Sequence, residues 1–174
     1  MYTGGGLFGS DEGLTLFNYI IGLIKNEWHP DWSMKEERQY RDDLMEFLRK
    51  HLDKTHTVKP EESRALADIG IDRRIGIELK LNLNKGTDVD RLIGQLQRYL
   101  KDYDYILVVL LGKTDRGIES EIIQRVGELE RSLGQSNMFP NMFGKRKLIR
   151  VIPKSPDESE VKERKNERQD NFFG

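Results

Sequence analysis

Hydrophobic side chains recur three and four positions apart in four segments of the chain, which is the spacing of amphipathic helices. The predicted helices cover about 14–24, 34–52, 88–100 and 118–133. Start signals precede three of them: Ser10 or Asp11, a capping box formed by Ser33 and Glu36, and Thr87 as an N-cap. Gly134 is expected to end the fourth.

Three further stretches have the character of β-strands. Residues 105–111 are almost continuously apolar and end at Gly112, as expected of a strand covered on both faces. Residues 148–152 form a last predicted strand. Between His56 and Ser63 there is room for a short strand that Pro60 interrupts. Helices packed on a mixed central sheet, an α/β fold, are the economical solution for this order of elements.

Strict alternation over 67–81 predicts a β-hairpin that turns at Arg73 and Arg74. The aliphatic residues share one face, and Asp68, Glu78 and Lys80 share the other, because successive side chains of a strand point to opposite sides.

Two registers of this hairpin keep the faces separate. In one, Gly70 lies opposite Glu78 and Asp68 opposite Lys80. In the other, Gly70 lies opposite Gly76 and Asp68 opposite Glu78, with Asp72 out in the turn. Asp68 neighbours Glu78 in both, and Asp72 is the alternative acidic residue.

The chain has 174 residues, 36% of them hydrophobic and 34% charged, with no cysteine. We expect a flexible N-terminus over 1–13, one α/β domain over 14–153 and a disordered charged tail over 154–174. The longest apolar stretch near the start is too short to span a bilayer, so we expect no membrane association and a cytoplasmic location.

The net charge of -1 argues against a protein that coats nucleic acid nonspecifically, since such binding comes from lysine and arginine. A local basic surface remains possible, because basic residues gather between the second helix and the hairpin turn. They are Lys50, Lys54, His56, Lys59, Arg64, Arg73 and Arg74. Such residues could form a patch or be ordinary solvated surface charge.

The combination of residues over about 33–112 resembles the PD-(D/E)XK nuclease superfamily. That family has a helix with an acidic residue, a hairpin with Asp and then Glu-x-Lys, a following helix and a buried strand. Here these positions look like Glu37, Asp68, Glu78-Leu79-Lys80, the helix after Thr87 and the strand over 105–111. Gln95-x-x-x-Tyr99 is similar to a motif of the RecB-type branch. Ala67 stands where the family has proline.

The resemblance implies a restriction-endonuclease-like core and a site for Mg²⁺ or Mn²⁺. Asp68, Glu78 and Glu37 would be the metal ligands, because hard carboxylate oxygens suit Mg²⁺. Lys80 would orient the attacking water or neutralise the phosphate. Gln95 would position substrate or nucleophile by hydrogen bonding. Tyr99, one turn further along the helix, has the pattern of a core residue as much as of a site residue.

The expected function is therefore hydrolysis of DNA phosphodiester bonds by a metal-dependent nuclease, catalysed by Glu37, Asp68, Glu78, Lys80 and Gln95. Cutting two strands takes two sites, so a homodimer is the expected assembly. The alternative is a catalytically inactive nuclease-fold module that binds nucleic acid or a protein partner. A third possibility is an interaction domain that acts through its charged tail.

Overall fold

The computed structural model of this chain describes residues 11–60, 66–135 and 147–156. The expected flexible N-terminus over 1–13 and disordered tail over 154–174 lie outside these residues for 1–10 and 157–174, as does the predicted loop after the fourth helix. Both boundaries are wrong by a few residues, since residues 12–13 are helical and Lys154 lies in a strand. Within them the chain forms four helices and five strands in one α/β arrangement, which confirms the predicted class. In chain order they are α1 (Glu12–Asn26), α2 (Glu37–His51), β1 (Val58–Pro60), β2 (Ile69–Ile71), β3 (Ile75–Leu81), α3 (Gly86–Tyr99), β4 (Tyr105–Leu111), α4 (Arg116–Gln135) and β5 (Leu148–Lys154).

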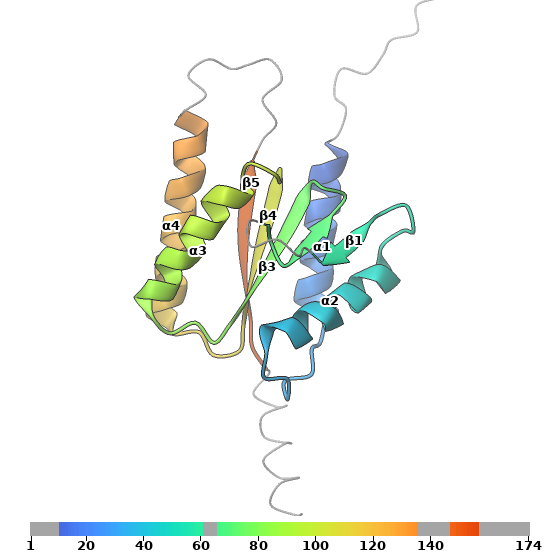
Figure 1. The fold of residues 1–174 in the computed structure, drawn as a ribbon, viewed down its shortest axis with the longest axis horizontal. Helices are drawn as coiled ribbons and strands as arrows, with labels where there is room; N and C mark the ends of the chain where they lie inside the picture. The colour runs from blue at the N-terminus through green and yellow to red at the C-terminus, as the bar shows by residue number, and fades with distance from the viewer. Residues whose placement is uncertain (1–10, 61–65, 136–146, 157–174) are drawn as a thin grey trace, which may run out of the picture.

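The five strands form one mixed sheet in the order β1-β2-β3-β4-β5. Strands β1, β2 and β3 are antiparallel neighbours, whereas β3, β4 and β5 run parallel. Parallel neighbours need a crossover, and α3 and α4 supply the two crossovers (Figure 1). The sheet therefore has an antiparallel half and a parallel half that meet at β3.

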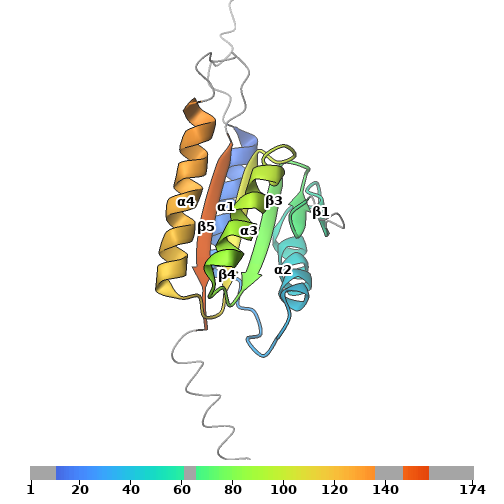
Figure 2. The same cartoon turned by 60° about the vertical axis from the view of Figure 1, so that its left-hand side comes forward.

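Two hydrophobic cores lie on opposite faces of this sheet. Helices α1 and α2 pack against the odd-numbered residues of β3 and β4, and α3 and α4 pack against the even-numbered residues of β4 (Figure 2). Every residue of β4 is buried because helices cover both of its faces. The predicted strand over 105–111 is thus confirmed. None of the helices in the described ranges is long and apolar enough to cross a membrane.

The helix starts differ from the predicted ones where a side chain has a different partner. Asp11 caps α1, as one of the two predicted caps, so this helix begins at Glu12 and not at 14. A capping box precedes α2, but Glu36 and Gln39 form it, so its prediction from Ser33 and Glu36 is wrong. The Ser33 hydroxyl donates to Asp31, and the side chain of Gln39 accepts from the backbone N–H of Glu36. Hydrogen-bonding partners, more than residue type, decide where these helices begin.

Two other helix boundaries also differ from the prediction. Thr87 lies inside α3, whose N-cap is Lys85. Gly134 does not end α4, which continues to Gln135. A glycine inside a helix costs only about 1 kcal/mol relative to alanine, which packing can offset.

The hairpin adopts the second of the two predicted registers, with Gly70 opposite Gly76 and Ile69 opposite Ile77. Its turn places Asp72 and Arg73 at positive φ, 51° and 55°. The N–H of Arg74 closes the turn by donating to the carbonyl of Ile71 at 3.0 Å. Extending the register by one pair brings Asp68 beside Glu78.

Close packing at the hairpin predicts the effect of Gly76→Ala. A Cβ atom at Gly76 would lie 2.8 Å from the ring of Tyr103 and 3.1 Å from Ala67. We expect the free energy of unfolding to fall by about 1–3 kcal/mol, because overpacking strains a filled core. Gly22→Ala in α1 is the matched control, since a Cβ there meets nothing within 4 Å. Urea denaturation measures both; equal midpoints for the two variants would contradict the packing described here.

Candidate active site

Lys80 and Glu78 form an ion pair on the face of β3 that points away from α1 and α2. Lys80 Nζ lies 2.6 Å from Glu78 Oε1. The glutamate side chain is only 2% exposed and the lysine side chain 16%. Both lie two residues apart on one strand, so they share a face. A carboxylate this deeply buried is rare unless it has a partner, and Lys80 is that partner.

Glu37 comes to the same lysine from the first residue of α2. Its Oε2 lies 3.5 Å from Lys80 Nζ, and 44% of its side chain is exposed. The start of α2 lies near the carboxyl end of β3 (Figure 1), which explains how residues 43 positions apart in sequence meet. Lys80 therefore bridges a buried and a half-exposed carboxylate.

Asp68 lies just before β2 and is tied to β3. Its Oδ2 accepts a hydrogen bond from the backbone N–H of Leu79 at 2.8 Å. Strand β2 begins only at Ile69, so this N–H has no backbone partner there and the aspartate satisfies it. The bond holds the Asp68 carboxylate between the two strands, beside Glu78.

Gln95 and Tyr99 approach the cluster from α3, one helical turn apart. Gln95 Nε2 donates to the Tyr99 hydroxyl at 3.3 Å. Burial, and then the charge of neighbouring Glu78, raise the pKa of Tyr99, so this hydroxyl stays protonated. Tyr99 is 1% exposed. The tyrosine thus belongs both to the core and to the polar cluster.

The three carboxylates outnumber the one ammonium, and the pKa values reflect this imbalance. Burial raises the pKa of Glu78; Lys80 opposes the rise, and the Asp68 charge adds to it. Glu37 shows the same pattern, with burial again the main cause. Burial by itself would lower the pKa of Lys80, but the carboxylates of Glu78 and Glu37 outweigh it and raise that pKa. Lys80 is therefore firmly a cation.

The structure brings together all five predicted site residues, Glu37, Asp68, Glu78, Lys80 and Gln95, and it separates Asp72 from them. Asp72 lies in the hairpin turn, where Oδ1 accepts from the N–H of Thr57 and Oδ2 contacts His56 Nδ1, both at 2.7 Å. Of the two candidate aspartates, Asp68 is the one beside Glu78. The sequence did not decide whether Tyr99 belongs to the core or to the site. Its position one helical turn after Gln95 was the feature that indicated a place in the site.

The cluster has buried polar atoms without a partner in the residues described. These are Glu78 Oε2 and Gln95 Oε1. The Tyr99 hydroxyl also interacts with the Glu78 carboxylate. Buried polar atoms are normally hydrogen-bonded, so both oxygens are positions where a bound water or cation would add a contact. No group of three or more His, Cys, Asp or Glu side chains in the described ranges is already arranged as a metal site. The oxygen donors and the surplus negative charge nevertheless fit a hard divalent cation.

The raised pKa of Glu78 predicts a pH dependence of stability. Its ordinary value is 4.5. Because the pKa of Glu78 is higher in the folded protein than in the unfolded chain, the folded state binds the proton more tightly. The resulting contribution to the free energy of unfolding is fully present below about pH 4.5 and is lost as the pH rises through the folded-state pKa. Relative to the wild type, Glu78→Gln should therefore gain free energy of unfolding as the pH increases, measured by urea denaturation in EDTA.

Glu46→Gln is the matched control for this titration. Glu46 is exposed, and a hydrogen bond from Lys50 lowers its pKa. Its contribution has the opposite sign, present above its ordinary pKa and lost as the pH falls. If the free energy of unfolding changed with pH in the same way for the wild type and Glu78→Gln, the pKa of the buried carboxylate would be unshifted.

No protein-family model, curated protein or solved structure matches this chain. What the cluster can do chemically must therefore follow from its own charges, hydrogen bonds and burial.

Proposed function

We propose that this chain is a Mg²⁺-dependent nuclease that hydrolyses phosphodiester bonds in DNA, with a site of the PD-(D/E)XK type. The observation that carries the proposal is the buried Glu78 carboxylate, which has one oxygen on Lys80 and the other without a partner in the described residues. A structural ion pair has no need of such an oxygen, since leaving it buried and unpaired costs free energy. A site for a positively charged ligand does need such an oxygen, because the ligand becomes its partner.

Asp68, Glu78 and Glu37 are the residues that would hold the cation. Asp68 uses Oδ2 and Glu78 uses Oε1 for contacts within the protein, which leaves Asp68 Oδ1 and Glu78 Oε2 outside those contacts. A bound Mg²⁺ or Mn²⁺ supplies charge stabilisation at the phosphate and acidifies a water molecule. Burial, and after it the charge of Asp68, raises the pKa values of Glu37 and Glu78; these shifts also support the role, because a bound cation would stabilise the charged form of both carboxylates.

Lys80 provides the permanent positive charge of the site. Its raised pKa keeps the ammonium protonated at neutral pH. An ammonium held at this position can neutralise a phosphate oxygen or fix the orientation of a nearby water molecule. Its contacts to Glu78 and Glu37 limit its motion, so it is positioned before substrate arrives.

Gln95 has the geometry of a positioning residue. Its amide nitrogen is engaged by Tyr99, which fixes the orientation of the side chain and leaves the buried Oε1 to accept a hydrogen bond. A water molecule or a substrate hydroxyl is a suitable donor. The neutral, protonated Tyr99 hydroxyl beside Glu78 restricts the carboxylate from the other side.

The arrangement of elements supports the same proposal at the level of the fold. A helix bearing Glu37 precedes the hairpin, and α3 and the buried β4 follow it. This is the order expected of a restriction-endonuclease-like core. A homodimer acting on both strands of DNA is part of the proposal, because a single cluster of this kind cuts one strand.

A noncatalytic nuclease-fold module is the second candidate. The observation that favours it is the 2.6 Å contact between Lys80 and Glu78, which partly closes the site, together with the lack of a preformed group of three metal ligands in the ranges described. In that case the cluster would serve to hold β3, α2 and α3 together.

Substitutions in the ion pair separate the two candidates. With Mg²⁺ or Mn²⁺ and linear, single-stranded or branched DNA, Lys80→Met and Glu78→Gln should each lower the cleavage rate at least about 10²-fold, because each removes a charge from the reacting centre. The exposed pair Lys50 and Glu46 on α2 offers matched controls, Lys50→Met and Glu46→Gln, which should keep the wild-type rate. Cleavage that survives both site substitutions, or that no DNA form elicits, would exclude the nuclease.

Binding of the cation has a readout that does not depend on activity. Mg²⁺ or Mn²⁺ should raise the wild-type free energy of unfolding, by about 2.7 kcal/mol at a hundredfold excess over Kd, because the ion binds only the folded state. Asp68→Asn and Glu78→Gln should reduce this gain, and Glu46→Gln should retain it. Thermal unfolding measures the effect; an identical gain in all four proteins would place the cation elsewhere.

A further inference from the structure

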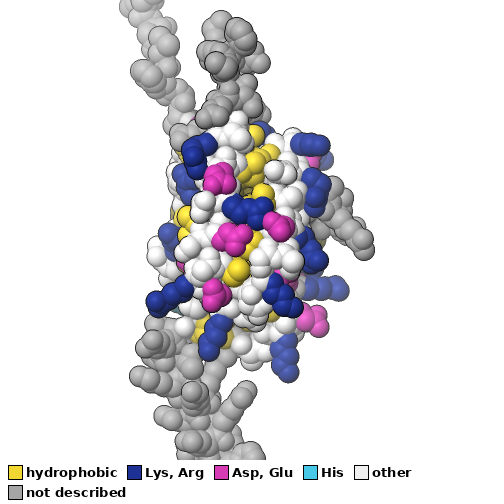
Figure 3. Space-filling view, turned by 90° about the vertical axis from the view of Figure 1, so that its left-hand side faces the viewer, with side chains coloured by type: hydrophobic (Ala, Val, Ile, Leu, Met, Phe, Trp, Pro, Cys, Tyr) yellow, Lys and Arg dark blue, Asp and Glu magenta, His cyan; other side chains and the backbone are white. Residues whose placement is uncertain are grey.

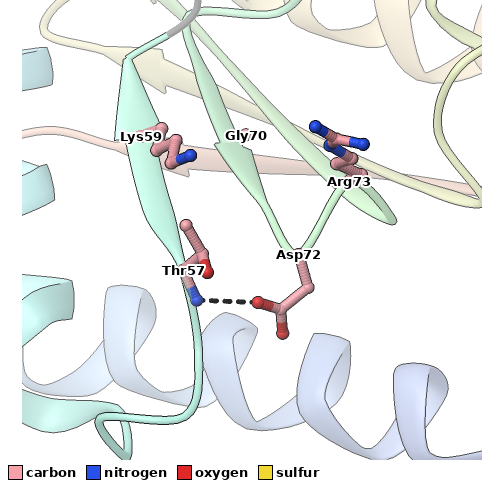
Figure 4. Close-up of a pocket in the computed structure, with 5 residues that line it drawn as sticks. All are labelled: Thr57, Lys59, Gly70, Asp72 and Arg73. Carbon is pink, nitrogen blue, oxygen red and sulfur yellow. Dashed lines mark hydrogen bonds between the residues drawn. The ribbon is translucent and has the colours of Figure 1, made fainter.

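A surface hollow of about 590 Å³ lies beside strands β1 and β2 and the β2-β3 turn, and its lining contains none of the residues proposed for catalysis. It is lined by Thr57, Lys59, Gly70, Asp72 and Arg73. Figure 4 shows Lys59 and Arg73 on either side of Gly70, with Thr57 and Asp72 at one end. Side chains of both strands and of the turn therefore contribute to one concave surface.

The lining has a surplus of positive charge. Lys59 and Arg73 are exposed, and neither forms an ion pair with another residue in the described part of the chain. Arg74, next in sequence, differs because Asp11 and Asp104 neutralise it. Among the lining residues that the structure describes, the carboxylate is that of Asp72, whose two oxygens are occupied by Thr57 and His56. Two unpaired cations thus stand against one engaged carboxylate.

The register of the sheet places this hollow on the same face as the carboxylate cluster. Lys59 pairs with Gly70, and Gly70 pairs with Gly76. Asp68 lies two residues before Gly70 and Glu78 two residues after Gly76, so all five positions face the same side. Two residues along a strand span about 7 Å. The hollow and the carboxylate cluster therefore lie on one face of the sheet.

The chemistry of the lining selects an anion over a base or an apolar group. It offers an ammonium, a guanidinium and the Thr57 hydroxyl, and its five residues include no aromatic ring. Stacking of bases needs aromatic side chains, whereas lysine, arginine and hydroxyl groups contact phosphates. The face formed by α3 and α4 differs, since acidic and basic side chains alternate over it (Figure 3).

We propose that this hollow binds the phosphate backbone of the DNA strand that enters the cluster, with Lys59 and Arg73 as the contact residues. The inference rests on the proposed function and specifies the path of its substrate. Because phosphates carry no sequence information, the contacts add affinity without sequence preference.

The test is the salt dependence of DNA binding by the full chain in EDTA, where no cleavage occurs. Labelled duplexes of two unrelated sequences are titrated by fluorescence anisotropy at several salt concentrations. Lys59→Gln with Arg73→Gln should reduce the steepness of log K against log salt by about 1.8, since each lost phosphate contact removes about 0.9. The reduction should be the same for both sequences. Glutamine keeps a side chain at Arg73, so the backbone at φ 55° is unchanged.

The control removes two positive charges from the helices on the other face of the sheet, Lys25→Gln with Lys50→Gln. This double variant should keep the wild-type slope. A Lys59/Arg73 variant whose slope equals that of the control overturns the proposal, as does a wild type that binds neither duplex. An acidic peptide serves as a competitor. If it displaces DNA from the control variant but not from the Lys59/Arg73 variant, the result supports an anion site at the hollow.

Failure of this inference can be told from failure of the nuclease. If the wild type cleaves DNA and the Lys59/Arg73 variant keeps the full salt slope, the hollow is excluded and the nuclease stands. If the wild type never cleaves but the slope falls as expected, the hollow stands as a DNA-binding surface of the noncatalytic module.

Discussion

The site depends on one constraint, which is that Glu78 is a carboxylate buried inside the protein. A buried charge needs compensation, and Lys80 provides it at 2.6 Å. Lys80 also contacts Glu37 at the start of α2, and Glu78 lies against Tyr99 on α3. Three elements that are distant in sequence therefore meet because one strand carries an acid where burial would otherwise exclude it. The compensation is incomplete, since three carboxylates share one ammonium. Glu78 Oε2, for which the described residues supply no hydrogen-bond donor, marks where further positive charge would fit.

The division of the sheet into two halves explains why such a cluster is accessible. In the parallel half, α3 and α4 complete the crossovers and cover the even-numbered residues of β4. In the antiparallel half, a tight turn connects β2 to β3, and the hollow beside Gly70 lies on this face of the sheet. The carboxylates lie at the boundary, on β3. A reacting group at this place is held by a rigid sheet on one side and can be reached from the open half on the other.

Much of this was contained in the sequence. Alternation over 67–81 assigns Asp68, Glu78 and Lys80 to one face in both registers that keep the polar and aliphatic faces separate, because the period of a strand is two. The apolar run over 105–111 identifies a strand covered on both sides, and the bounds of β4 agree with it. The helical periodicity of residues after Thr87 places Gln95 and Tyr99 one turn apart. These are local consequences of backbone geometry, so a single sequence determines them.

Tertiary structure decided what depends on partners distant in sequence. The backbone N–H of Leu79 binds Asp68, which fixes the register and distinguishes Asp68 from Asp72, and no local pattern contains that bond. Likewise, Ser33 is a residue type that commonly caps helices, but its hydroxyl donates a hydrogen bond to Asp31 and does not cap α2. The basic residues before the hairpin turn looked equivalent, yet folding pairs Arg74 with two aspartates and leaves Lys59 and Arg73 at the hollow. Residue type and spacing determine which face a side chain occupies, whereas its charge state and its partners depend on what the rest of the chain brings to that face.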